Sequence, residues 1–269
     1  MKAIRIHGRG GPDHLVYEEA PLPSLGPGEV LVRVAAAAIL VNELRWEITY
    51  QTASGEPRPL PIPGRDLCGV VAEVGAGVSE VTVGDAVYAM LGYGRDGAEA
   101  GYAIALPSEL APKPRTLNDM QAAAAPLSAL TAWQALFIHA NMSSGQRVLI
   151  QGASGGVGTY AVQFTHWAGA QTLATASARN ADFLRDLGAD VIIDYATTRF
   201  EDVAYDVDVV FDLVGPCDAR GKRCGLEAFW SLWSPHLQRI RRHDRMCASS
   251  TSSSSRVEPN CARSVTCST

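Results

Sequence analysis

The sequence lacks several features that would place it in a membrane, secreted or nucleic-acid-binding class. Its apolar runs are all shorter than the ~20 residues that a membrane-spanning helix needs. The first residues, from Met1 to His7, carry charges where a signal peptide carries its apolar stretch. The net charge is −5, whereas nucleic-acid-binding proteins normally present a basic surface. These absences predict a soluble, cytoplasmic protein with neither a nucleic-acid nor a membrane partner.

Cysteine and basic residues are scarce in the first part of the chain and concentrated at its end. Residues 1–215 contain one cysteine, Cys68, and 14 Lys and Arg against 24 Asp and Glu, a net charge of −10. Residues 216–269 contain the other five cysteines, with 9 Lys and Arg against 4 Asp and Glu, a net charge of +5. The chain therefore has two compositions, which we interpret separately.

Short apolar segments bounded by glycine or proline dominate the first 117 residues. With 47% hydrophobic residues over 269 positions, the chain is long enough for two domains with their own cores. Apolar, β-branched segments predict strands over residues 29–35, 70–75 and 85–90. Strands of this length, separated by turn residues, predict a small β-barrel or sandwich over residues 1–117.

Helical and strand patterns alternate in the part of the chain that follows. This alternation predicts an α/β domain with a parallel sheet over residues 118–215, its second helix beginning at Pro126. Trp133 and Trp167 are expected in its core. The expected helices cover residues 121–125, 127–141, 156–168 and 180–187, and the expected strands cover residues 147–151, 172–175, 190–193 and 207–212.

A glycine-rich turn lies between the first of these strands and the helix that follows it. A dinucleotide-binding fingerprint requires this context, because glycines permit the tight turn and let the backbone approach a pyrophosphate at the helix N-terminus. The alternative is a turn with a structural role alone. We predict a dinucleotide site with candidate contacts at Gly152, Ser154, Gly155, Gly156, Val157 and Gly158.

The end of the second strand predicts which dinucleotide binds. An NAD site needs an Asp or Glu there for the ribose 2′-hydroxyl, and residues 174–180 contain no carboxylate. Arg179 offers a guanidinium suited to a 2′-phosphate, and Ser177 offers a hydroxyl donor. These residues predict NADPH as the cofactor. The alternative for Arg179 is a solvated residue at a helix start.

Three motifs resemble, in the same order, those of the medium-chain dehydrogenase/reductase superfamily. They are Asp85 within Val83–Val87, the segment Leu130–Leu136, and the turn Gly155–Gly158. The resemblance covers residues 1–215 and is closest to the zinc-free, NADPH:quinone oxidoreductase-like branch, which includes enone and enoyl reductases. It implies a GroES-like catalytic domain beside a Rossmann dinucleotide-binding domain, with the active site in the cleft between them.

The same resemblance implies that the metal site of zinc alcohol dehydrogenases is missing. Their cysteine ligand would fall near Leu40 and their histidine ligand at Arg65, and a protonated guanidinium has no lone pair for a metal. The four-cysteine structural lobe is absent from residues 91–110, and Cys68 alone builds neither site. We therefore predict no metal.

Without a metal, the resemblance implies hydride transfer from NADPH to a quinone, an enone or a similar conjugated carbonyl compound. The segment around Asn42, Glu43 and Trp46 is implied to line the substrate cleft, and Thr131 is similar to a threonine beside the nicotinamide. The alternatives are an Asn that ends a strand and a Thr that packs on the sheet. Asn42, Glu43 and Thr131 are the predicted catalytic residues, and the substrate is a small molecule.

The family pattern stops after Gly215. Family members continue with another glycine, a helix and a strand containing Pro-Gly-Gly, and nothing in residues 216–269 matches. Three explanations are open: a change of reading frame, a natural disordered tail, or a cysteine-based module. We expect an incomplete Rossmann sheet, and the usual homodimer contact through its edge strand stays open. The alternative function is an inactive remnant or a nucleotide-binding protein of the same fold.

Overall fold

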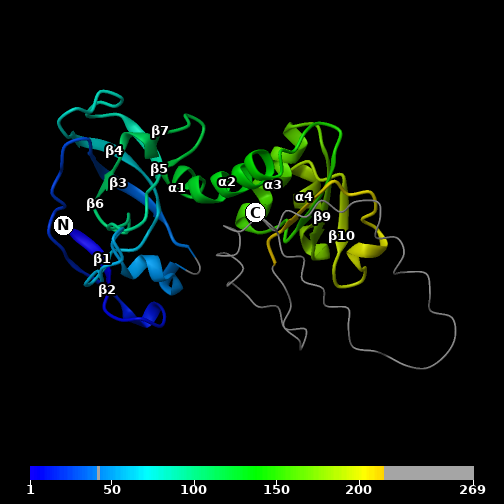
Figure 1. Cartoon of the computed structure of the whole chain (residues 1–269), viewed down its shortest axis with the longest axis horizontal. Coiled ribbons are helices and arrows are strands. Elements are labelled where there is room, and N and C mark those ends of the chain that lie inside the picture. Colours follow the sequence, from blue (N-terminus) through cyan, green and yellow to red (C-terminus); the bar gives the residue numbers. More distant parts are fainter. Residues whose placement is uncertain (41–42, 215–269) are drawn as a thin grey trace.

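Two separate β-sheets form the framework of the molecule, and short helices lie between them (Figure 1). The computed structural model describes residues 1–40 and 43–214. The predicted aberrant tail, residues 216–269, therefore lies outside the described residues. The described part has the α/β class expected from the sequence, with a β-rich first unit followed by a parallel sheet.

The first unit is built on a five-stranded antiparallel sheet with the order β6-β3-β4-β5-β7. Its central strands are apolar and β-branched, which suits a pleated surface buried on one face. Their inward side chains form one core, which includes Val32, Leu67 and Val87. A two-stranded hairpin, β1 with β2, precedes the sheet. The strands are β1 (Lys2–Ile6), β2 (Leu15–Glu19), β3 (Val30–Ala38), β4 (Asp66–Val74), β5 (Ala86–Met90), β6 (Tyr102–Ala105) and β7 (Leu110–Pro112).

Two helices connect the first unit to the second. Helix α1 (Asp119–Ala123) begins at a capping box, in which Asn118 accepts from the Gln121 N–H and the Gln121 side chain returns to the Asn118 N–H. Helix α1 packs on β3 and β4, whereas α2 packs on α3 of the second unit and approaches β5. The two helices therefore carry the contact between the two units (Figure 1).

The second of these helices differs from the single α-helix expected over residues 127–141. Helix α2 (Pro126–Trp133) begins at its proline and is followed by a π-helical segment, Gln134–His139. The Ala140 N–H bonds the Ala135 carbonyl, five residues back, at 2.9 Å. Apolar spacing indicates a helix but does not distinguish i→i−4 from i→i−5 hydrogen bonding, so the sequence did not predict this wider turn.

The second sheet is parallel and has the order β10-β9-β8-β11, which is third, second, first, fourth in chain order. This order matches the first four strands of a Rossmann sheet, in which the crossover helices lie on the faces. The predicted strands are all present, shifted by one or two residues at their ends. The elements are β8 (Arg147–Gln151), α3 (Gly156–Trp167), β9 (Gln171–Ala176), α4 (Ala181–Asp186), β10 (Val191–Asp194) and β11 (Val209–Asp212).

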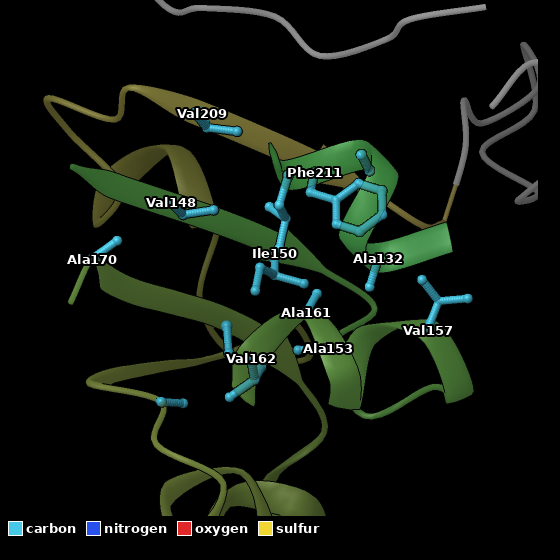
Figure 2. Packing of buried hydrophobic residues seen from close by; sticks show 14 of the residues in the cluster. Ala132, Val148, Ile150, Ala153, Val157, Ala161, Val162, Ala170, Val209 and Phe211 are labelled. Atoms are coloured by element: carbon cyan, nitrogen blue, oxygen red, sulfur yellow. The ribbon is translucent and has the colours of Figure 1, made fainter. Parts of the chain in front are cut away.

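The main core of this unit lies between the sheet and the helices α2 and α3. Figure 2 shows Ile150 of β8 and Phe211 of β11 directed toward Ala132 of α2 and Ala161 of α3. The small helix residues let the helices approach the sheet closely, and the larger strand residues fill the space between. This packing sets where α2 and α3 begin, and therefore where the glycine turn points.

Trp133 and Trp167 do not belong to this core, contrary to expectation. The two residues are 39% and 71% exposed, and their rings contact each other at a tilt. Phe137 contacts both tryptophans, and Phe164 contacts Trp133 edge-on. The prediction failed because large apolar residues are normally buried, whereas the space between helix and sheet is here filled by alanine and valine.

Candidate functional site

The turn between β8 and α3 has the geometry of a pyrophosphate-binding turn. Gly152 has φ +72°, a conformation that L side chains rarely adopt, and its carbonyl accepts from the Gly155 N–H at 3.0 Å. Gly155 is the N-cap of α3, and Gly155 and Gly156 are both exposed. The first N–H groups of a helix have no partner within it and favour negative charge. The exposed end of α3 can therefore receive a phosphate.

The third glycine of the turn is required by close packing. A Cβ atom at Gly158 would lie 2.5 Å from the Gly152 carbonyl oxygen and 2.6 Å from that of Ala153, closer than real Cβ atoms approach. Only glycine lets α3 begin this near to β8. The turn thus fits a dinucleotide for two reasons. The N-terminal end of α3 is exposed, and the close packing at Gly158, which any side chain there would disrupt, keeps this end beside β8. Ser154 lies half-buried and Val157 buried within the same turn.

The carboxyl end of β9 lies beside this turn, as an adenine ribose site requires. The Gly152 N–H donates to Thr175 Oγ1 at 3.2 Å, which links the two segments. Ser177 and Arg179 follow directly, Ser177 half-buried and Arg179 exposed, and Asn180 donates to Ser177 Oγ at 3.3 Å. The structure therefore brings the predicted phosphate-binding residues to the same edge of the sheet as the glycine turn.

Tyr195 is a candidate that the sequence analysis missed. Its backbone N–H bonds the Ala176 carbonyl at 3.4 Å, so the residue after β10 lies next to the end of β9. Its side chain is half exposed there. The carboxylate of Asp194, the residue before Tyr195, bonds within its own loop, where it accepts from the Ala196 N–H at 3.0 Å. The sequence analysis missed Tyr195 because only the order of the strands in the sheet shows that the ends of β9 and β10 are neighbours.

Helix α2 supplies hydroxyl groups on the other side of the glycine turn. The Thr131 hydroxyl donates to the Leu127 carbonyl of its own helix at 2.7 Å and is half-buried. Ser128 Oγ lies 3.3 Å from the point that a Cβ atom at Gly156 would occupy. Ser128 is therefore the α2 residue with a contact at the turn, and the role predicted for Thr131 stays a prediction.

A buried ion pair lies where the resemblance placed the zinc ligands. Arg65 and Glu43 are each 2% exposed, and Arg65 Nε donates to Glu43 Oε1 at 3.3 Å. The Gly64 N–H donates to the same oxygen at 2.8 Å. The guanidinium also donates to the carbonyls of Gly92, at 2.8 Å, and Arg95, at 3.2 Å and 3.3 Å. Arg65 thus binds a carboxylate and two backbone oxygens at once.

The burial of Glu43 does not support the catalytic role predicted for it. Burial raises the pKa of Glu43, and the charge of Arg65 opposes this shift. Its Oε2 has no hydrogen-bond partner in the described part of the chain. Glu43 holds Arg65 and is almost fully buried, and the catalytic role predicted for it stays a prediction. Asn42, the other catalytic prediction in this segment, lies outside the described residues.

Asp66 connects the two units of the molecule. Both of its carboxylate oxygens accept from the Leu127 N–H, at 3.1 Å each, so a residue of β4 satisfies the first turn of α2. Asp66 is buried, and burial raises its pKa to about 7, although the hydrogen bond from the Leu127 N–H lowers that pKa. Asp66 therefore supports the junction of the two units.

Two carboxyl groups, the buried Asp66 and the half-buried Glu99, predict that the stability of the fold falls as pH rises. Burial raises the pKa of Asp66 and of Glu99 to about 7, well above the values in an unfolded chain. The folded state therefore binds more protons between pH 4 and 7, and the free energy of unfolding decreases through this window. We expect a loss of about 3–4 kcal/mol per group over the full window, and Asp66→Asn should reduce the slope. Urea unfolding at several pH values measures it. The exposed Asp182→Asn is the matched control, and identical slopes in both variants would contradict this explanation.

The structure was also searched for metal sites and membrane helices. Over residues 1–40 and 43–214, no three His, Cys, Asp or Glu side chains are grouped so as to hold a metal ion. In the same ranges no helix has both the length and the apolar character needed to cross a bilayer.

Two family models match the chain. Residues 26–115 match the alcohol dehydrogenase GroES-like domain, and residues 156–220 match the zinc-binding dehydrogenase model. The first covers the antiparallel sheet, and the second begins at the first residue of α3. The β-rich unit and the parallel sheet thus correspond to two different family domains.

Curated relatives and solved structures extend this similarity over most of the described chain. A chloroplastic quinone oxidoreductase of Triphysaria versicolor is 34% identical over 247 residues, which are 89% of this chain and 72% of the relative. A chloroplastic quinone-oxidoreductase homologue of Spinacia oleracea is 40% identical over 73% of this chain, which spans only 62% of that relative. The structure of the quinone oxidoreductase from Coxiella burnetii has a TM-score of 0.73 and 33% identity, covering 80% of this chain and 69% of that one.

Proposed function

Since the chain belongs to the quinone-oxidoreductase-like members of the medium-chain dehydrogenase/reductase superfamily, we propose that it is an NADPH-dependent oxidoreductase. Its substrate in this proposal is a small conjugated carbonyl compound, either a quinone or an enone. Relatives named as quinone oxidoreductases and as an NADPH-dependent alkenal/one oxidoreductase support this substrate class. Bound NADPH would supply the hydride.

The glycine turn is the single observation that carries the proposal. Its free helix end, the left-handed Gly152 and the tight contact at Gly158 together fit a dinucleotide pyrophosphate. Arg179 and Ser177 favour a 2′-phosphate at the end of β9, because no carboxylate occupies that strand end. Tyr195 is a further candidate contact at this edge.

The proposal places hydride transfer in a site without zinc. One matched family model carries the description of zinc-binding dehydrogenases, but in this chain Arg65 takes the position of a histidine ligand. Its guanidinium is already bound to Glu43 and to two carbonyl oxygens. A zinc ion would have to displace this buried ion pair and would find a positive charge in its place.

A second candidate function is nucleotide binding without turnover. The chain spans only 62% of the spinach relative, and the match to the second family model ends at residue 220. A protein with the glycine turn but without a working substrate cleft would bind NADPH and fail to oxidise it. The small-molecule substrate and the cytoplasmic location both stay predictions.

Oxidation of NADPH in the presence of a quinone tests the proposed function and its metal independence together. We expect acceptor-dependent loss of absorbance at the nicotinamide band, and we expect the rate to be unchanged after dialysis against a chelator. Elemental analysis should find much less than one zinc per chain. NADPH binding without oxidation would favour the second candidate function. A rate that disappears with the chelator and returns with zinc would contradict the zinc-free site.

A further inference from the structure

Tyr93 lies beside the buried ion pair of Arg65 and Glu43. No role described so far explains its phenol. It lies in the loop after β5 and is 37% exposed, and its ring contacts Trp46 and Arg65. The Trp46 ring meets it edge-on at 6.2 Å, and the Arg65 guanidinium carbon lies 5.8 Å from its centroid. The ring is therefore in contact with protein on at least two sides, and about a third of the residue stays accessible to solvent.

The loop that carries Tyr93 is held on both sides of it. Glu109 accepts from the Gly92 N–H at 2.9 Å and forms an ion pair with Arg95. From beneath, Arg65 donates to the carbonyls of Gly92 and Arg95. Four contacts on the flanking residues thus hold the backbone on both sides of Tyr93. A reactive side chain on a loop needs such support to keep a fixed position.

A series of contacts links the loop of Tyr93 to the glycine turn. The end of β5 pairs with the start of β4, where Met90 is opposite Asp66. Asp66 binds the Leu127 N–H of α2, and Ser128 lies against the turn at Gly156. This series of contacts leads from the proposed cofactor turn to the loop of Tyr93 without leaving the junction of the two units.

We propose that Tyr93 is the proton donor in the reduction of conjugated carbon–carbon double bonds, an inference that rests on the proposed function. Hydride adds to the β-carbon of the acceptor, and the electron pair of the double bond moves toward the carbonyl oxygen to give an enolate. The α-carbon then takes the proton of the Tyr93 hydroxyl as the O–H bond breaks. The exposed phenolate regains a proton from water.

The surroundings of Tyr93 suit this role. Burial raises the pKa of Tyr93, Arg65 opposes the shift, and Glu43 and Asp66 reinforce it. The phenol therefore keeps its proton at neutral pH, as a donor must. The Arg65 guanidinium lies 5.8 Å from the ring centroid, and its charge would stabilise the phenolate that forms until water returns the proton.

Two measurements test the proposal, one of them independent of turnover. Tetranitromethane should nitrate Tyr93 in the free chain, and saturating cyclohex-2-enone should protect it. Tyr17, which is 69% exposed on the N-terminal hairpin, should be nitrated equally in both conditions. In turnover, Tyr93→Phe should lower kcat for the enone by roughly 10²- to 10⁴-fold, the range of general acid catalysis. It should leave quinone reduction within about twofold, because the oxygen anions of a reduced quinone take protons from water.

Each result decides a different point. Equal enone rates in Tyr93→Phe and the wild type, or no protection of Tyr93 from nitration, would overturn this inference and leave the proposed function standing. Equal losses with enone and quinone, together with a lowered unfolding temperature, would show that Tyr93 is only structural and overturn it as well. A wild-type chain that oxidises NADPH with neither acceptor removes the proposed function, and this inference falls with it. Tyr17→Phe is the control variant and should change neither rate.

Discussion

Replacing Arg179 with alanine is expected to weaken NADPH binding by roughly 10- to 100-fold and to leave NADH binding unchanged. A hydrogen bond to a charged group contributes about 1.5–3 kcal/mol, and about 1.4 kcal/mol corresponds to a tenfold change in affinity, so the expected loss equals one such bond to the 2′-phosphate. Arg179 is exposed at the end of β9, beside Ser177 and close to the glycine turn. Isothermal titration calorimetry with both dinucleotides measures the two affinities.

The neighbouring Arg185 provides the matched control for this change. It lies on α4, pairs with Asp182 at the surface, and should tolerate alanine without a change in either affinity. A wild-type preference for NADH would contradict the role given to Arg179. If neither dinucleotide binds the wild-type chain, the chain is no NADPH-dependent enzyme, and both candidate functions are lost.

Replacing Arg65 with methionine is expected to destabilise the fold by about 3–5 kcal/mol, the usual cost of leaving a buried charge without its partner. In the described part of the chain, Glu43 would keep one hydrogen-bond donor, the Gly64 N–H, and the carbonyls of Gly92 and Arg95 would lose the Arg65 guanidinium. A typical domain is stable by only about 5–15 kcal/mol, so this single change could remove most of the margin. Urea unfolding followed by circular dichroism measures the loss.

A second variant distinguishes the loss of charge balance from the loss of packing. The double variant Glu43→Gln with Arg65→Met removes both charges and should recover a large part of the stability, because a neutral amide is cheaper to bury than a carboxylate. Arg199→Met removes an exposed ion pair with Glu201 and should cost less than about 1 kcal/mol. If the double variant is no more stable than Arg65→Met alone, the charge of Glu43 is not the cause.

Features that depend on a few consecutive residues were predictable. The capping box at Asn118, the proline that begins α2 and the glycine turn after β8 all act within one or two turns of chain. Patterns of apolar residues indicated the eight principal strands and helices of the second unit, and the resemblance indicated the class of the fold. Each of these signals is local, because backbone conformation and capping respond to neighbouring residues.

The sequence by itself thus determined the two sheets, the glycine turn after β8, and an arginine where the resemblance expects a histidine ligand. Only the tertiary structure decided what that arginine does, since Glu43, Gly92 and Arg95 reach it from three separate segments. It also decided that Trp133 and Trp167 lie at the surface, because alanine and valine already fill the space beneath the helices. Burial and long-range contacts depend on how the elements are packed together, and no periodicity along the chain records that packing.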